Sequence, residues 1–219
     1  MRQLIKDFVS LAADSIPIPE PIYEFGSLRV PGQEDFADLR PLFPQQAYIG
    51  CDMREGIGVD TVLNLHEIDL QSESVGTVLC LDTLEHVEYP HQAMKEVYRI
   101  LKPNGVAIMS SVMNFPIHDY PYDYWRFTPE AFKSILKPFA DAFVGFAGNE
   151  NFPHTVVGIG FKGKTPPLSG FSSKYDNWQR SQAKSIEQLV KVVTPPILLP
   201  VLSLLVNRVK GLRKRKRVT

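Results

Sequence analysis

Cysteine is scarce in this sequence of 219 residues, which contains only Cys51 and Cys80. Two isolated cysteines without metal-ligand spacing exclude a disulfide framework and a cysteine-based zinc site, and we expect no metal site. Each cysteine lies in an apolar run, so both are predicted to be small buried core side chains. The N-terminus lacks a long apolar stretch with a small-residue cleavage site, so we expect a cytoplasmic and not a secreted protein.

A long hydrophobic run is also missing. The apolar segment 196–206 has eleven residues and contains two prolines, whereas about twenty apolar residues are needed to span a bilayer. The formal net charge is zero, but seven of the 24 basic residues lie in the last twelve positions, where no acidic residue occurs. The remaining 1–207 therefore carry 17 basic against 24 acidic side chains.

An apolar segment followed by a basic cluster is typical of an interfacial membrane anchor. We therefore predict that 196–217 lies on an anionic membrane surface, at the inner face of the membrane. Two alternatives remain open: an arm packed on the domain or on a partner, and a nucleic-acid contact. The second is disfavoured because no aromatic residues alternate with the basic ones.

The glycine-rich fingerprint of dinucleotide-binding sites is absent as well. The segment Gly26–Pro31, which follows the first predicted strand, offers one of the three glycines of G-x-G-x-x-G. A site that binds no pyrophosphate does not need those glycines, so this absence counts against a nicotinamide oxidoreductase.

The most informative stretch is 77–112. Two apolar runs, 78–81 and 106–109, flank a segment whose apolar residues recur at helical spacing: Ala93, Val97, Ile100 and Leu101. The turn Lys102–Gly105 supplies a helix stop. This pattern predicts a strand, a helix and a strand of a buried parallel sheet.

The rest of the chain predicts an α/β fold with a doubly wound, mostly parallel sheet. Further strands are expected at 22–26, 47–51 and 59–65, final antiparallel strands at 139–146 and 155–162, and amphipathic helices at 2–13 and 183–193. Thr128 and Pro129 mark the start of another helix, and residues 163–180 are predicted to be irregular. The domain organisation expected is an N-terminal helix and linker (1–20), a catalytic domain (21–165) and a C-terminal extension (166–219).

Polar residues follow several of these strands, at the edge where ligands bind in parallel sheets. Gly26 allows close approach of a ligand to the backbone, and Asp52 ends the second strand, where a carboxylate can accept hydrogen bonds from a ribose diol. Asn64 and His66 follow the third strand. Asp82 and Glu85 follow the fourth, where an alternative role is to cap the next helix. His86 is expected to pack or bond locally.

Two segments resemble class I S-adenosylmethionine-dependent methyltransferases: Asp82–Val87, with its Leu-Glu-His element, and Glu96–Gly105, which contains R-x-L-K-P-x-G. Tyr48–Asp52 is similar to the acidic second-strand motif of that family. The resemblance covers about residues 21–145 and implies a Rossmann-like methyltransferase fold. Phe115–Phe132 resembles a subgroup associated with cell-surface polysaccharide and glycolipid genes.

The resemblance implies S-adenosylmethionine as the cofactor and assigns roles to particular residues. Glu24 and Gly26 would contact its methionine part, Asp52 its ribose, and Asn64 with the Leu65 backbone its adenine. Asp82 would line the sulfonium end. The family's first motif is usually an acid followed by G-x-G-x-G, whereas this chain has a single glycine after Glu24.

The loop 114–127 is rich in aromatic side chains. Flat aromatic faces suit sugar rings and a guanidinium suits an anion, so the acceptor-binding residues are predicted to be Tyr122, Trp125 and Arg126. His118 and Asp119 are the candidate general bases for a hydroxyl acceptor. The alternative is a hydrophobic cap over the sheet.

The sequence therefore predicts a methyltransferase that O-methylates a saccharide or a lipid-linked glycan. The alternative is a catalytically inactive protein of the same fold that serves as a binding subunit at the membrane surface.

Overall fold

The computed structural model describes residues 2–29, 32 and 37–193, with side chains up to Gln182. The predicted membrane-surface segment 196–217 lies outside the described residues. The chain divides into two compact units, 1–180 and 181–219. The fold and the site described below belong to the first unit; the described part of the second unit is helical.

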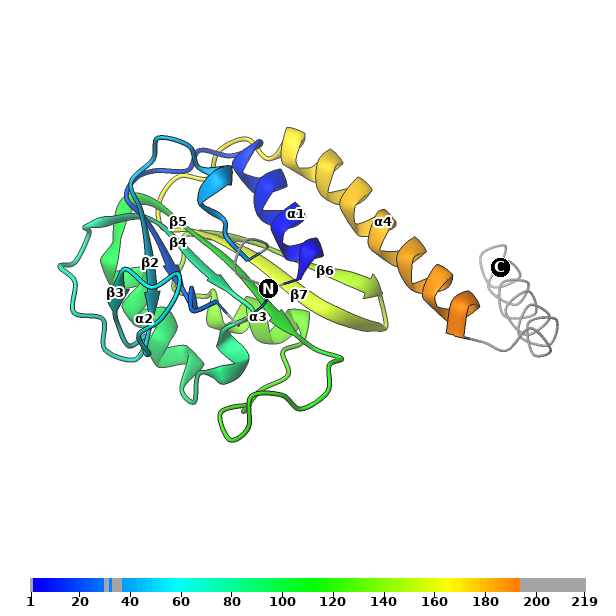
Figure 1. Ribbon diagram of the computed structural model, residues 1–219. Helices are drawn as coiled ribbons and strands as arrows, with labels where there is room; N and C mark the ends of the chain where they lie inside the picture. Colours follow the sequence, from blue (N-terminus) through cyan, green and yellow to red (C-terminus); the bar gives the residue numbers. More distant parts are fainter. Residues whose placement is uncertain (1, 30–31, 33–36, 194–219) are drawn as a thin grey trace. The chain divides into compact units, whose positions relative to one another are not determined.

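The described strands form one seven-stranded sheet in the order β3-β2-β1-β4-β5-β7-β6 (Figure 1). The first five pair in parallel, and β7 pairs antiparallel with both β5 and β6. This arrangement confirms the predicted doubly wound, mostly parallel sheet with antiparallel final strands. The strands are β1 (Ile22–Phe25), β2 (Tyr48–Asp52), β3 (Thr61–Val62), β4 (Val75–Leu81), β5 (Leu101–Val112), β6 (Asp141–Asn149) and β7 (Phe152–Phe161).

Strand β4 lies at the centre of the sheet, and all seven of its residues are buried. This explains why its sequence is continuously apolar rather than alternating, since both faces of a parallel sheet are covered by helices. Cys51 and Cys80 are both buried and free, as predicted.

Helices cover both faces of the sheet (Figure 1). The helices α2 (Pro90–Ile100) and α3 (Pro129–Ile135) pack on one face through a core that includes Val97 and Phe132. The opposite face is covered by α1 (Gln3–Ala13) and by the first part of α4 (Ser169–Val193), through Phe171, Tyr175 and Trp178. The start of α3 is as predicted: the Thr128 side chain accepts a hydrogen bond from the Ala131 N–H at 3.1 Å, and Pro129 is the first helical residue.

The prediction of an irregular segment at 163–180 was wrong beyond residue 168, because α4 begins at Ser169. Phe171, Tyr175 and Trp178 lie four and three residues apart, so they share one face of the helix. All three are buried. The ring centroids of Phe171 and Trp178 lie 6.3 and 5.3 Å from that of Phe8 in α1, and the Trp178 Nε1 donates to the Leu4 carbonyl oxygen at 3.0 Å. An aromatic stripe thus replaces the aliphatic pattern that identified the other helices.

The third strand is shorter than predicted, because Asp60 and Asn64 at its ends bond elsewhere. Asp60 accepts a hydrogen bond from the Gly50 N–H at 2.7 Å, and Asn64 turns back to bridge Glu67. The described residues between β1 and β2 form one 3₁₀ turn, η1 (Arg40–Leu42). Among the helices that the structure describes, none is long and apolar enough to cross a membrane.

Phe171 tests whether α4 belongs to the core. Because its ring is fully buried and contacts Phe8, Phe143 and Tyr175, we expect Phe171→Ala to lower the free energy of unfolding by about 3–5 kcal/mol. Urea unfolding of the full chain measures this change. Asp176→Ala, an exposed position on the same helix, is the matched control and is expected to change stability by about 0.5 kcal/mol or less. Equal effects of the two substitutions would contradict the packing described.

Candidate active site

The candidate site lies where the parallel strands β1, β2, β4 and β5 end. Phe25 at the end of β1 is in register with Cys51 of β2 and Cys80 of β4, and Leu81 of β4 is in register with Ser110 of β5. The segments that follow these strands therefore meet at one edge of the sheet, which is the ligand-binding edge of open α/β sheets.

Asp52 ends β2 with its side chain 9% exposed. One carboxylate oxygen, Oδ1, accepts a hydrogen bond from the Arg54 N–H at 3.0 Å and lies 3.5 Å from the Arg54 guanidinium. The structure thus holds Asp52 at the strand end, where the sequence predicts a ribose-binding carboxylate.

Gly26 follows β1 in the left-handed region, with φ of +85°. A side chain here would collide with Thr83, whose Oγ1 would lie 2.1 Å from an added Cβ. The Thr83 hydroxyl in turn lies 3.2 Å from the Phe25 carbonyl oxygen and 3.0 Å from that of Leu81. Glycine is therefore required for the close packing of the β1 and β4 ends, whether or not it also contacts a ligand.

Glu24 is buried inside β1, and its Oε2 accepts a hydrogen bond from the Tyr48 hydroxyl at 2.8 Å. Burial raises the pKa of Glu24 to about 7, although the Tyr48 hydrogen bond and the positive charges of Arg40 and Arg29 act in the opposite direction. Burial, together with the Glu24 charge, also raises the pKa of the Tyr48 phenol. Glu24 thus has a structural role, the hydrogen bond that joins β1 to β2 through Tyr48, in addition to its predicted contact with a cofactor.

The segment after β3 is held by its own side chains. The Asn64 Oδ1 accepts a hydrogen bond from the His66 N–H at 3.0 Å and lies 3.2 Å from the His66 Nδ1. The His66 Nε2 accepts from the Tyr89 N–H at 3.1 Å. Leu65 is buried. These bonds fix the turn that the sequence places beside the adenine.

Asp82 follows β4 with φ of +48° and is paired with Arg2. Its two carboxylate oxygens accept hydrogen bonds from the Arg2 Nη2 at 2.8 Å and Nε at 3.0 Å, and the Ser110 hydroxyl donates to Oδ1 at 2.8 Å. The same guanidinium donates to the Thr155 hydroxyl at 2.5 Å. A bidentate pair of this kind fixes geometry as well as charge.

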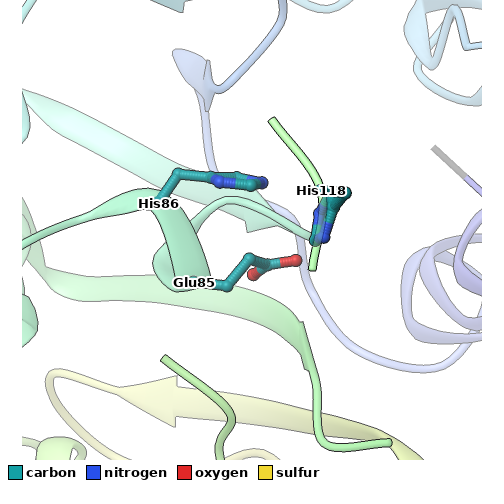
Figure 2. A group of neighbouring side chains, drawn as sticks. All are labelled: Glu85, His86 and His118. Carbon is teal, nitrogen blue, oxygen red and sulfur yellow. The ribbon is translucent and has the colours of Figure 1, made fainter. Parts of the chain in front are cut away.

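Glu85 is completely buried in the 3₁₀ turn η2 (Leu84–His86), which follows β4. The Ser111 hydroxyl of β5 donates to its Oε2 at 2.6 Å, whereas Oε1 has no hydrogen-bond partner among the residues that the structure describes. Burial, and then the negative charge of Asp82, raise the pKa of Glu85 above the usual range of a carboxyl group. Figure 2 shows its carboxylate directed toward His118, with His86 beside them.

The loop 114–127 is organised by Asp123, whose side chain is 1% exposed. The Arg126 guanidinium donates to both of its carboxylate oxygens, at 2.5 and 2.8 Å, and the His118 N–H donates at 2.7 Å. These interactions, with the Arg126 hydrogen bond foremost, hold the pKa of Asp123 well below its usual range. The loop is anchored to η2, because the Tyr124 and Trp125 N–H groups both donate to the Glu85 carbonyl oxygen.

The two predicted catalytic residues, His118 and Asp119, differ in exposure and in the residues that they contact. His118 is one-third exposed, and its ring centroid lies 4.7 Å from that of His86. Asp119 is half-exposed, has φ of +51° and lies 4.0 Å from the Arg54 guanidinium. The structure thus brings His118, and not Asp119, beside Glu85.

The predicted acceptor-binding residues also differ from one another. The Tyr122 and Trp125 rings are 55% and 44% exposed, and the Trp125 Nε1 donates to the Val87 carbonyl oxygen at 3.0 Å. The Arg126 guanidinium bonds inside the loop, to Asp123 and to the Phe115 and Pro116 carbonyl oxygens. Exposed aromatic faces are therefore available to a ligand, while Arg126 mainly holds the loop together.

Polar residues of the site that were not selected by the sequence include Arg2, Ser110, Ser111, Asp123 and Thr155. Ser111 and Thr155 lie in strands whose apolar neighbours dominate the pattern, and Arg2 precedes a helix far along the chain from Asp82. Only Asp123 had a local signal, since Asp123 and Arg126 lie three residues apart with opposite charges.

Residues 49–109 match a family described as methyltransferase domain. No curated protein matches the chain. Among solved structures, an S-adenosylmethionine-dependent methyltransferase from Archaeoglobus fulgidus is 16% identical, with a TM-score of 0.57, and the match covers 74% of this chain and 95% of that one.

Two further structures show the same fold. A methyltransferase from Thermotoga maritima, described as a possible histamine N-methyltransferase, is 20% identical with a TM-score of 0.53, covering 73% of this chain and 89% of that one. The 1,6-didemethyltoxoflavin-N1-methyltransferase of Burkholderia thailandensis, solved with S-adenosylhomocysteine, is 15% identical with a TM-score of 0.54, covering 74% and 78%. This chain therefore has the fold of S-adenosylmethionine-dependent methyltransferases and contains the sequence pattern of a methyltransferase domain.

The buried Glu24 makes stability depend on pH. Its pKa is about 7 in the folded protein and about 4.3 in an unfolded chain, so the folded state binds the proton more tightly. Its contribution to stability is complete below the unfolded pKa and is lost as the pH rises to about 7. We expect the free energy of unfolding of Glu24→Gln, relative to the natural protein, to increase by about 3 kcal/mol between pH 4 and pH 8.

Urea unfolding of both proteins at a series of pH values measures this difference. Comparing the two proteins at each pH cancels the titration of all other groups. A difference that stays constant from pH 4 to pH 8 would show that Glu24 ionises as an ordinary carboxyl group.

Proposed function

We propose that this protein transfers the methyl group of S-adenosylmethionine to a hydroxyl group of a saccharide or a lipid-linked glycan. The observation that carries the proposal is that the segment 49–109, which matches a methyltransferase domain, supplies the ends of β2 and β4 to the same sheet edge at which the exposed aromatic loop is anchored. S-adenosylmethionine is the donor indicated by the matched domain and the shared fold.

The proposed cofactor site follows the strand ends. Asp52 binds the ribose hydroxyl groups, and Asn64 with the Leu65 backbone meets the adenine. Glu24 and Gly26 contact the methionine part, and Asp82 lines the sulfonium end. The Arg2 guanidinium and the Ser110 hydroxyl hold the Asp82 carboxylate in a fixed position at this edge, which supports a role in shaping the site rather than in supplying net charge.

Asp52 provides the direct test of the cofactor site. We expect calorimetric titration of the full-length protein to show binding of S-adenosylmethionine and of S-adenosylhomocysteine, and Asp52→Ala to weaken both at least tenfold. The reason is the loss of charge-assisted hydrogen bonds to the ribose, each of which contributes about 1.5–3 kcal/mol.

The matched control is Glu55→Ala, because Glu55 is an exposed acid in the loop that follows Asp52. It should bind both compounds as the natural protein does. If the folded natural protein binds neither compound, the chain is not a methyltransferase, and the role of a binding subunit with this fold becomes the better explanation.

The proposed acceptor lies against the loop 114–127. The exposed rings of Tyr122 and Trp125 suit the apolar face of a sugar, and Arg126 holds the loop beside them. The acceptor oxygen attacks the methyl carbon in line with the carbon–sulfur bond, which breaks to release S-adenosylhomocysteine. His118 accepts the hydroxyl proton, with Asp119 as the second candidate base. Positioning supplies much of the rate, because the sulfonium is already activated.

A methyl-transfer assay tests the acceptor class. Radiolabelled S-adenosylmethionine is offered with free saccharides, nucleotide sugars and lipid-linked glycans. On an acceptor so identified, we expect His118→Ala to lower kcat about 10²–10⁴-fold with little change in cofactor affinity, as for loss of a general base. Trp125→Ala is expected to raise the acceptor KM instead. Transfer to nitrogen acceptors only, with no saccharide methylated, would contradict the proposed acceptor.

Association with an anionic membrane surface through 196–217 belongs to the same proposal. It is supported by the charge and apolar content of that segment, and it would place the protein near lipid-linked acceptors at the cytoplasmic face of the membrane.

A further inference from the structure

Three side chains with metal-binding groups converge at the carboxyl edge of the sheet. Glu85, His86 and His118 each offer one potential ligand atom, and these atoms all lie within 4.8 Å of one another (Figure 2). Glu85 and His86 come from the turn after β4, and His118 comes from the loop after β5. We propose that these three residues bind a divalent transition-metal ion of the Zn²⁺, Co²⁺ or Mn²⁺ class.

The Glu85 carboxylate points to a ligand that the described side chains do not supply. It is completely buried, its Oε2 is occupied by the Ser111 hydroxyl at 2.6 Å, and its Oε1 has no hydrogen-bond partner. An unpaired buried carboxylate oxygen is costly, because the group loses its hydration without compensation. A bound cation would satisfy that oxygen and its charge together.

Both imidazole rings are held with their Nδ1 atoms engaged. The His86 Nδ1 lies 2.7 Å from the Tyr122 carbonyl oxygen. The His118 Nδ1 lies 3.2 Å from the Pro116 carbonyl oxygen and 3.3 Å from the Asp123 carboxylate. Since these partners only accept hydrogen bonds, each Nδ1 is positioned as the donor, which leaves Nε2 as the ring atom available to a metal. A histidine oriented by a carbonyl or a carboxylate is the usual arrangement around a bound metal.

The surrounding charges favour a cation at this place. Asp82 is paired with Arg2 and Asp123 with Arg126, so the nearby acidic and basic groups largely neutralise each other. Glu85 is left as the acid of this group without an ion-pair partner among the described residues. The Glu85 carboxylate therefore supplies a negative charge for a bound cation, while the positive charges of Arg2 and Arg126 are offset by Asp82 and Asp123.

Two imidazoles and one carboxylate are a ligand set for Zn²⁺ and its neighbours, and not for the oxygen-seeking Mg²⁺ or Ca²⁺. Ligand atoms on a tetrahedral ion with bonds of about 2.1 Å lie about 3.4 Å apart. Since the ligand atoms of the three residues lie up to 4.8 Å apart, binding requires them to approach one another by up to about 1.4 Å. Three protein ligands leave a fourth position for water or an acceptor oxygen.

The metal site stands independently of the proposed acceptor. If the proposed function holds, a cation there would bind the acceptor hydroxyl and lower its pKa, and the His118 Nε2 would be a ligand instead of a base. The two roles of His118 differ in a measurable way, since only the metal role makes activity sensitive to chelators.

Binding is measured on the full-length protein, without a histidine tag, after treatment with EDTA and removal of the chelator. Co²⁺ is titrated while its visible d–d absorption is followed, and Zn²⁺ is then added to displace it. We expect one equivalent of Co²⁺ to bind with tetrahedral-type absorption and Zn²⁺ to abolish the signal. His86→Ala, His118→Ala and Glu85→Gln are each expected to weaken binding at least tenfold.

His91→Ala is the matched control, because His91 is exposed on α2 and outside the cluster. Replacing His86 or His118 is expected to leave the fold intact, because neither residue is buried. The circular dichroism spectrum of each variant checks that it is folded. Failure of the folded natural protein to take up Co²⁺ or Zn²⁺, or uptake that His86→Ala and His118→Ala leave unchanged, would overturn the site.

A parallel titration with S-adenosylhomocysteine separates this proposal from the proposed function. Cofactor binding without metal uptake would overturn the metal site and leave the methyltransferase intact. Metal uptake without cofactor binding would overturn the methyltransferase and leave the metal site intact.

Discussion

The parallel pairing of β4 between β1 and β5 is the constraint on which the rest of the structure depends. β4 is buried over its whole length and is paired in parallel with both neighbours. Because the three strands run in the same direction, the polar residues that follow them emerge at one edge. The collision that any side chain at Gly26 would make with Thr83 shows how closely these strand ends approach.

Most of the sheet could be predicted from the sequence, because buried parallel strands appear as continuous apolar runs and the helix α2 has a clear 3.6-residue period. The start of α4 could not. Its buried face consists of Phe171, Tyr175 and Trp178, which follow helical spacing, but they stand in an otherwise polar stretch where no aliphatic residue reinforces the pattern. Asp60 and Asn64 shorten β3 through hydrogen bonds that a propensity pattern does not contain.

The positions of the site residues at strand ends followed from the sequence, whereas their partners did not. Asp52 ends β2 and Asp82 follows β4, as the apolar runs before them predicted. The sequence does not indicate that Arg2 reaches Asp82, 80 residues away, or that Ser111 occupies one oxygen of Glu85 and leaves the other unpaired. His86 and His118 are 32 positions apart, and only the folding of the loop 114–127 around the buried Asp123 brings their rings together. Long-range pairs of this kind require three-dimensional coordinates.

Arg2 precedes the first turn of α1, a helix that packs on the opposite side of the sheet from α2 and α3, yet its guanidinium lies at the ligand-binding edge. The seating of α1 on the aromatic face of α4 therefore sets the electrostatic potential at the end of β4. A partner or a ligand that shifted α1 along the sheet would carry a full positive charge away from Asp82 without touching any strand. Packing on one face of the sheet is in this way coupled to the charge at its ligand-binding edge.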